Sequence, residues 1–175
     1  MLRSVMFCTS LLATVPVAAQ PAALTGKAIP AALSGKMLDL GALLRDQTAE
    51  MPAKSVQVQI VPEFQLAVVV FALTGWAGGG NHFTNHLAVF RTESGEDGTL
   101  NYRLIDTLVI GGRGTRSVDK LRVAVQQEQD GNSLLLRIPA KANLPEDSPN
   151  FPSKPITLTL RLKDQRLSIL SPKTS

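Results

Sequence analysis

The clearest pattern in the chain is the stretch Ile156-Thr157-Leu158-Thr159-Leu160-Arg161-Leu162-Lys163, in which every second residue is apolar. Successive side chains of a β-strand point to opposite faces, so this alternation predicts a strand with one face in a core and the other in water. A polar pair, Asp164-Gln165, separates it from Leu167 and Ile169, which continue the pattern. The end of the chain is therefore predicted to be an antiparallel hairpin.

The same period of two recurs through most of the chain after Pro52. Residues 66–73 differ, because both of their faces are apolar, which predicts a central strand covered on two sides. The pair Asp130-Gly131 predicts a tight turn, since glycine accepts the positive φ that the turn needs. The patterns predict about eight strands, at residues 55–60, 66–73, 87–91, 102–110, 121–125, 134–138, 156–163 and 167–169. Their spacing predicts a mainly β fold, an antiparallel meander that forms a sandwich or a barrel.

One N-terminal helix is predicted to precede the strands. Between residues 36 and 51 the apolar residues recur near the helical period, and Pro52 provides a stop. The apolar positions are Met37, Leu40, Leu43 and Leu44. Residues 20–35 are rich in Ala, Pro, Gly and Thr and predict a flexible lead-in. We therefore expect residues 36–175 to form a single β-rich domain.

Residues 1–19 have the pattern of a signal peptide. Arg3 supplies a positive charge, residues 5–15 are mostly apolar, and Val17 and Ala19 are small enough for a cleavage pocket. The apolar run is far shorter than the roughly 20 residues that a membrane-spanning helix needs. We expect cleavage after Ala19 and a periplasmic or secreted product without a membrane span.

Composition narrows the possible partners. The only cysteine, Cys8, would leave with the signal peptide, which excludes disulfides and thiolate chemistry from the mature chain. The net charge is +4, and the basic residues are spread along the chain without a cluster of aromatic residues, so we expect no nucleic-acid binding. The expected partner is an envelope component or another protein, and the basic excess makes an anionic partner a candidate.

The most unusual segment is residues 75–86, which hold four glycines, both histidines and the only tryptophan, Trp76. His82 and His86 are four residues apart, so a divalent metal could bridge them, and Trp76 is a candidate ligand-binding residue. However, Phe83 follows the first histidine where a zinc protease has glutamate, and the sequence fixes no third ligand. The alternative is a glycine-rich surface loop with hydrogen-bonded histidines.

A second candidate site is the segment Gly111-Gly112-Arg113-Gly114-Thr115-Arg116-Ser117-Val118-Asp119-Lys120. Successive glycines can turn backbone N–H groups toward an anion, and two arginines could clamp it. The candidate ligand-binding residues are Arg113, Arg116, Asp119 and Lys120. The segment matches neither a Walker loop nor a dinucleotide fingerprint, so no cofactor is expected. The alternative is a wide hairpin turn with solvated arginines and an ion pair between Asp119 and an arginine.

Three segments together resemble an uncharacterised group of exported bacterial domains: residues 86–91, residues 102–119 and the loop 145–154. Those domains carry an Asp-rich loop, a Cys-Cys-Pro-Ser element and a closing β-hairpin ending near Gly-Arg-Leu. Here Asn150-Phe151 take the place of the cysteine pair, and Asp164-Gln165-Arg166-Leu167 matches the final turn loosely. The resemblance implies a β-rich envelope domain and implies no activity.

We therefore expect an exported, non-catalytic domain that binds an envelope component or a partner protein through its two glycine-rich loops. One alternative is a small metal-dependent hydrolase that uses His82 and His86. Another is a structural accessory subunit of an envelope complex, with an apolar patch that is covered only in that complex.

Overall fold

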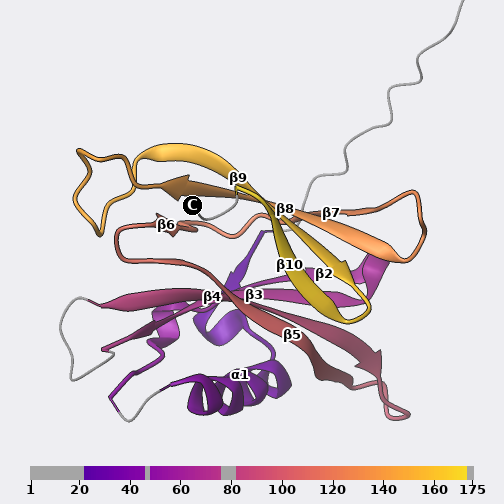
Figure 1. Cartoon of the computed structure of the whole chain (residues 1–175). Helices are drawn as coiled ribbons and strands as arrows, with labels where there is room; N and C mark the ends of the chain where they lie inside the picture. Colours follow the sequence, from indigo (N-terminus) through magenta and orange to yellow (C-terminus); the bar gives the residue numbers. More distant parts are fainter. Residues whose placement is uncertain (1–21, 46–47, 76–81, 173–175) are drawn as a thin grey trace, which may run out of the picture.

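The computed structural model describes residues 22–45, 48–75 and 82–172, and it confirms a mainly β fold with one α-helix (Figure 1). The signal-peptide segment lies outside these ranges, so its export role stays a prediction. In chain order the elements are β1 (Leu24–Thr25), η1 (Gly26–Ala28), α1 (Ala31–Leu44), η2 (Ala53–Ser55), β2 (Gln57–Val61), η3 (Pro62–Phe64), β3 (Leu66–Thr74), β4 (Phe83–Ser94), β5 (Leu100–Gly112), β6 (Arg116–Ser117), β7 (Ala124–Gln127), β8 (Ser133–Ala142), β9 (Lys154–Lys163) and β10 (Arg166–Ser171).

The strands form one antiparallel sheet in the order β1-β2-β3-β4-β5-β6-β8-β9-β10, with β7 paired to β8. All eight predicted strands are present, and β1 and β6 are additional strands of two residues each. The short β6 links two halves of the sheet that lie over one another, β2–β5 below and β7–β10 above in Figure 1. The sheet does not close, so of the two predicted architectures it is the sandwich that the fold resembles.

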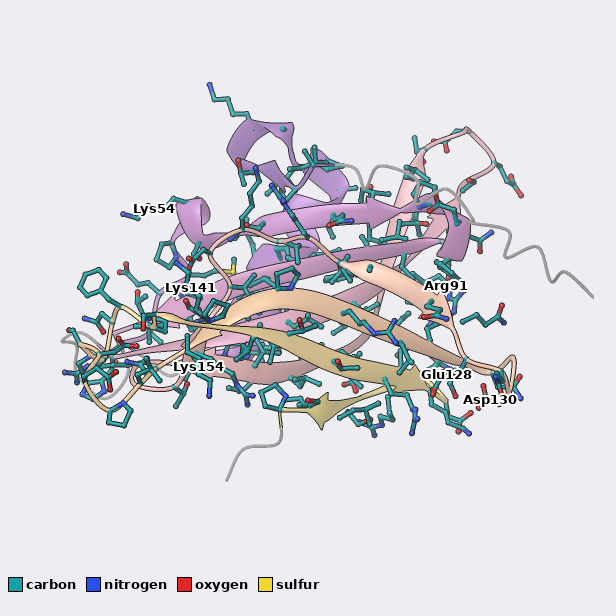
Figure 2. The ribbon with its side chains drawn as sticks, turned by 90° about the horizontal axis from the view of Figure 1, so that it is seen from above. Lys54, Arg91, Glu128, Asp130, Lys141 and Lys154 are labelled. Carbon is teal, nitrogen blue, oxygen red and sulfur yellow. The ribbon has the colours of Figure 1, made fainter. Side chains whose placement is uncertain are left out.

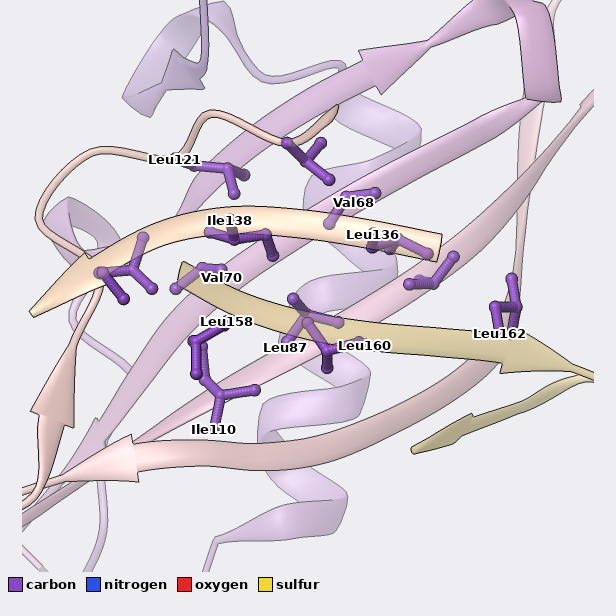
Figure 3. Packing of buried hydrophobic residues seen from close by; sticks show 14 of the residues in the cluster. Val68, Val70, Leu87, Ile110, Leu121, Leu136, Ile138, Leu158, Leu160 and Leu162 are labelled. Atoms are coloured by element: carbon purple, nitrogen blue, oxygen red, sulfur yellow. The ribbon is translucent and has the colours of Figure 1, made fainter. Parts of the chain in front are cut away.

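The main core fills the space between the two halves. Figure 3 shows Val68 and Val70 of β3 next to Leu136 and Ile138 of β8, and all four side chains are buried. The opposite face of β3 is also buried, against α1, through Ala67, Val69, Phe71 and Leu73. The prediction of a central strand with two covered faces is therefore confirmed.

The helix differs from its predicted bounds, because α1 begins at Ala31 and ends at Leu44. Pro30 precedes the first turn, where its missing N–H costs nothing, and Leu33 anchors that turn in the core. Part of the expected flexible lead-in is thus ordered, and β1 within it pairs with β2. Beyond the helix, Glu50 forms an antiparallel bridge to Thr74 at the end of β3.

Side chains hold the two layers together where backbone pairing is absent. Gln59 of β2 is buried, accepts a hydrogen bond from Val123 N at 2.8 Å and donates to Val123 O at 3.0 Å. Gln57 accepts from Leu121 N at 2.7 Å. These amides replace a neighbouring strand, which is why the predicted strand at 121–125 becomes regular only at Ala124. At the other edge, Asp106 of β5 accepts from Leu167 N at 2.7 Å.

Candidate functional site

The predicted anion-binding turn after β5 is closed by its own backbone. The N–H of Arg113 donates to Phe83 O at 3.2 Å, that of Gly114 to Pro149 O at 2.7 Å, and that of Thr115 to Gly112 O at 3.1 Å. A backbone nest needs free N–H groups that converge on the ligand, and these three are bonded to protein carbonyls. The prediction of a glycine nest is therefore wrong.

The two glycines at the end of β5 serve close packing instead. A Cβ on Gly111 would overlap the carbonyl oxygen of Arg116, and one on Gly112 would lie 2.7 Å from Phe83 O. Only glycine allows the chain to pass between β4 and β6 at these positions. The two glycines are therefore needed because the backbones of β4, β5 and β6 approach one another closely at this point.

The two predicted arginines do not form a clamp, because they lie in different environments. Arg113 is exposed, whereas Arg116 is 8% exposed and its Nη1 donates to Pro172 O at 3.0 Å. The carbonyl of Arg116 also accepts from the buried Asn85 side chain at 3.3 Å. Arg116 therefore links β6 to Pro172, which follows β10, and its side chain is not open to a ligand.

The other two predicted residues, Asp119 and Lys120, line a surface depression of about 340 Å³, which we call the lysine pocket. Its wall comprises Asp119, Lys120, Arg122, Pro139, Lys141 and Pro155, with Ala140 at the base. The structure thus brings together two segments that are about twenty residues apart in sequence, because the 118–123 segment runs beside β8. Sequence reasoning missed Arg122 and Lys141.

The acidic side chain of the lysine pocket is already occupied. Asp119 Oδ2 lies 2.7 Å from Lys141 Nζ, and Ser117 Oγ donates to Asp119 Oδ1 at 3.1 Å. These hydrogen bonds, Lys141 first, hold the pKa of Asp119 below its ordinary value. The predicted partner of Asp119 was an arginine, so that pairing is corrected to Lys141.

Lys120 and Arg122 point outward because the residues that alternate with them are buried. Leu121 and Val123 are buried in the core, and their backbone is held by Gln57 and Gln59. Alternation then turns Lys120 and Arg122 outward, where both are exposed. Within the described ranges neither Lys120 nor Arg122 has a carboxylate within ion-pair distance.

A second depression, the ion-pair groove, lies at the other end of β8 and has a volume of about 440 Å³. The charged and polar residues that line it include Glu128, Asp130, Ser133, Arg137, Arg161 and Lys163. Arg161 makes two bonds to Glu128, at 2.6 and 2.8 Å, and Lys163 lies 3.3 Å from Asp130. Hydrogen bonds from Ser133 and Asn132 lower the pKa of Asp130 to about 2. Most charges in this groove are therefore compensated.

The histidine site receives no support from the described residues. His82 is exposed and precedes β4, whereas His86 is buried within β4, with its ring stacked on Phe71 at 5.2 Å. Its Nε2 lies 3.0 Å from Thr84 Oγ1, and burial lowers the pKa of His86. Across the described ranges no group of three or more His, Cys, Asp or Glu is arranged to hold a metal. Trp76 lies outside the described residues.

Comparisons with family models, curated proteins and solved structures found no match for this chain. The resemblance to exported bacterial domains gains no support from them. Among the helices that the structure describes, none has the length and apolar character to cross a bilayer. The candidate site is thus defined by geometry alone: an open pocket with three cations and one carboxylate on the outer surface of the upper layer.

Proposed function

We propose that this chain is an exported, non-catalytic binding domain whose ligand is an anionic component of the cell envelope. The observation that carries the proposal is the lysine pocket, where Lys120, Arg122 and Lys141 converge and Asp119 is the single acid. With three positive charges and one negative charge, the pocket has a net positive charge and attracts anions. The export step rests on the signal-peptide pattern of residues 1–19.

The residues of the pocket favour binding over catalysis. The described residues that line it include no serine, threonine, cysteine or histidine, so the lining lacks the hydroxyl and thiol nucleophiles and the imidazole base that many hydrolases use. Arg122 can present a planar fork to a carboxylate or phosphate, and Lys120 adds a mobile point charge. Pro139 and Pro155 add rigid apolar surface to the wall, on which the stems of the basic side chains can lie.

The proposal is tested by retention on immobilised envelope polymers. We expect the purified protein to bind lipopolysaccharide or acidic peptidoglycan fragments and not neutral dextran. Salt should weaken binding, because the Debye length falls to about 8 Å at physiological ionic strength.

A matched pair of double variants separates the pocket from general charge. Lys120→Ser with Arg122→Ser should weaken binding by about tenfold, the combined effect of two exposed charge contacts. Lys27→Ser with Lys36→Ser removes the same charge from exposed positions near α1 and should leave binding within about twofold. The proposal fails if the wild type binds no anionic polymer at low salt, or if both double variants lose binding equally.

A further inference from the structure

The lysine pocket and the ion-pair groove lie on one continuous face, the side of β7–β9 turned away from the core. Strand β8 contributes Pro139 and Lys141 to the pocket and Ser133 and Arg137 to the groove. In Figure 2 Lys141 lies near one end of this outer face, and Glu128 and Asp130 lie at the other. From Ser133 to Lys141 the strand extends about 26 Å at roughly 3.3 Å per residue.

Arg137 connects the two depressions. It pairs in register with Ala124 of β7, so it follows Lys120 and Arg122 along the outer face. Its Nη1 donates to the neutral Gln126 at 2.8 Å, and within the described residues no carboxylate lies within ion-pair distance of it. Lys120 and Arg122 are two residues apart, and Arg137 lies across from Ala124, the residue two further along the same segment. A row of uncompensated cations matches a ligand with repeated negative charges better than it matches one small anion.

Neutral hydrogen-bonding side chains lie beside this row of cations. Thr157 and Thr159 of β9 pair in register with Pro139 and Arg137, so they share the outer face, and Thr157 is exposed. Gln126, also exposed, keeps its amide N–H groups beside Arg137. Threonine hydroxyls and a glutamine amide are suited to ligand hydroxyl groups, whereas arginine and lysine are suited to carboxylates.

Two other polyanions fit this face less well. Single-stranded nucleic acid is bound through aromatic side chains on which bases stack, and β7, β8, β9 and β10 contain no aromatic residue. An anionic membrane surface is bound by apolar residues that insert beside the basic ones. Among the described residues, the exposed large apolar side chains lie on α1, on β5 and at Phe151 in the loop between β8 and β9, and none lies on β7, β8 or β9 themselves.

We infer that the ligand is a linear acidic polysaccharide that lies along β8 and occupies the lysine pocket and the ion-pair groove together. This inference rests on the proposed function and adds the shape and the chemical class of the ligand. Several carboxylates of one chain would contact the row Lys120, Arg122 and Arg137, and sugar hydroxyls would contact Gln126 and Thr157.

Galacturonate monomer, trimer and octamer are suitable probes, measured by calorimetry with the purified protein at low salt. We expect the affinity per carboxylate to rise from monomer to octamer, because only the octamer reaches both depressions. Arg137→Ser should weaken octamer binding by about threefold and weaken monomer binding less, because a monomer can occupy the lysine pocket without Arg137. Lys36→Ser, which removes one exposed charge from α1, is the control and should change neither.

The outcomes separate this inference from the proposed function. If the monomer binds as tightly per carboxylate as the octamer, or if Arg137→Ser has no effect, the extended site is overturned and the anion pocket stands. Tighter binding of inorganic polyphosphate, or of vesicles containing phosphatidylglycerol, overturns the polysaccharide class. If no anionic probe binds at all, the proposed function falls as well.

Discussion

The segment that follows β5 has two parts with opposite roles, although it reads in sequence as one glycine- and arginine-rich motif. Residues 111–117 serve the fold: the glycines allow a close crossing, the N–H groups of residues 113–115 are bonded, and Arg116 is buried. Residues 118–123 place Leu121 and Val123 in the core and Lys120 and Arg122 in solvent. The glycines and arginines that resemble an anion-binding nest in sequence stabilise the fold here. The exposed charges of the lysine pocket come instead from residues that alternate with buried ones.

The largest effect on stability should come from a substitution in residues 111–117. Gly111→Ala places a Cβ against the carbonyl oxygen of Arg116, which is backbone and cannot rotate away. We expect a loss of at least about 3 kcal/mol in the free energy of unfolding, measured by urea denaturation. The control is Gly35→Ala on α1, where nothing lies within 4 Å and alanine should stabilise the helix by about 0.5–1 kcal/mol. Equal stability of the two variants would contradict the structural role of Gly111.

An intermediate effect should come from the amides that hold residues 118–123. Gln59→Leu fills the space but leaves the N–H and C=O of Val123 without their partners in a buried position. We expect a loss of about 2 kcal/mol in urea denaturation. Gln57→Leu should cost less, because Gln57 and its hydrogen bond from Leu121 N are only partly buried, whereas the bonds of Gln59 are buried. A cost for Gln57→Leu as large as that for Gln59→Leu would contradict the argument from burial.

Sequence patterns predicted β8 and β9 because burial on one face has a period of two, and they predicted β3 because both of its faces are apolar. They missed the helix start, because the run after Pro30 is rich in alanine and has little amphipathic contrast. They also missed β6, since a strand of two residues has no period to detect.

Sequence analysis identified two of the four charged residues of the lysine pocket, and there is a physical reason why it missed Lys141. Asp119 and Lys120 belong to the motif that sequence analysis singled out, whereas Arg122 and Lys141 do not. Lys141 joins them only because β8 lies beside this segment. The local alternation of apolar and polar residues does not show which distant segments will lie side by side. Arg122 was accessible to sequence reasoning, since it alternates with two buried residues of the predicted strand at 121–125.

The smallest effect on stability, and the sharpest test of the outward part, should come from Asp119→Asn. The side chain is about half exposed, and its ion pair with Lys141 is a surface pair, so unfolding should change by less than about 1 kcal/mol. Removing the one negative charge of the lysine pocket should nevertheless strengthen binding of acidic oligosaccharide. At about 6 Å in water a unit charge contributes roughly 0.7 kcal/mol, or about threefold in affinity. The gain should shrink as salt is added, since screening removes it, whereas the same substitution would weaken binding if Asp119 itself held the ligand.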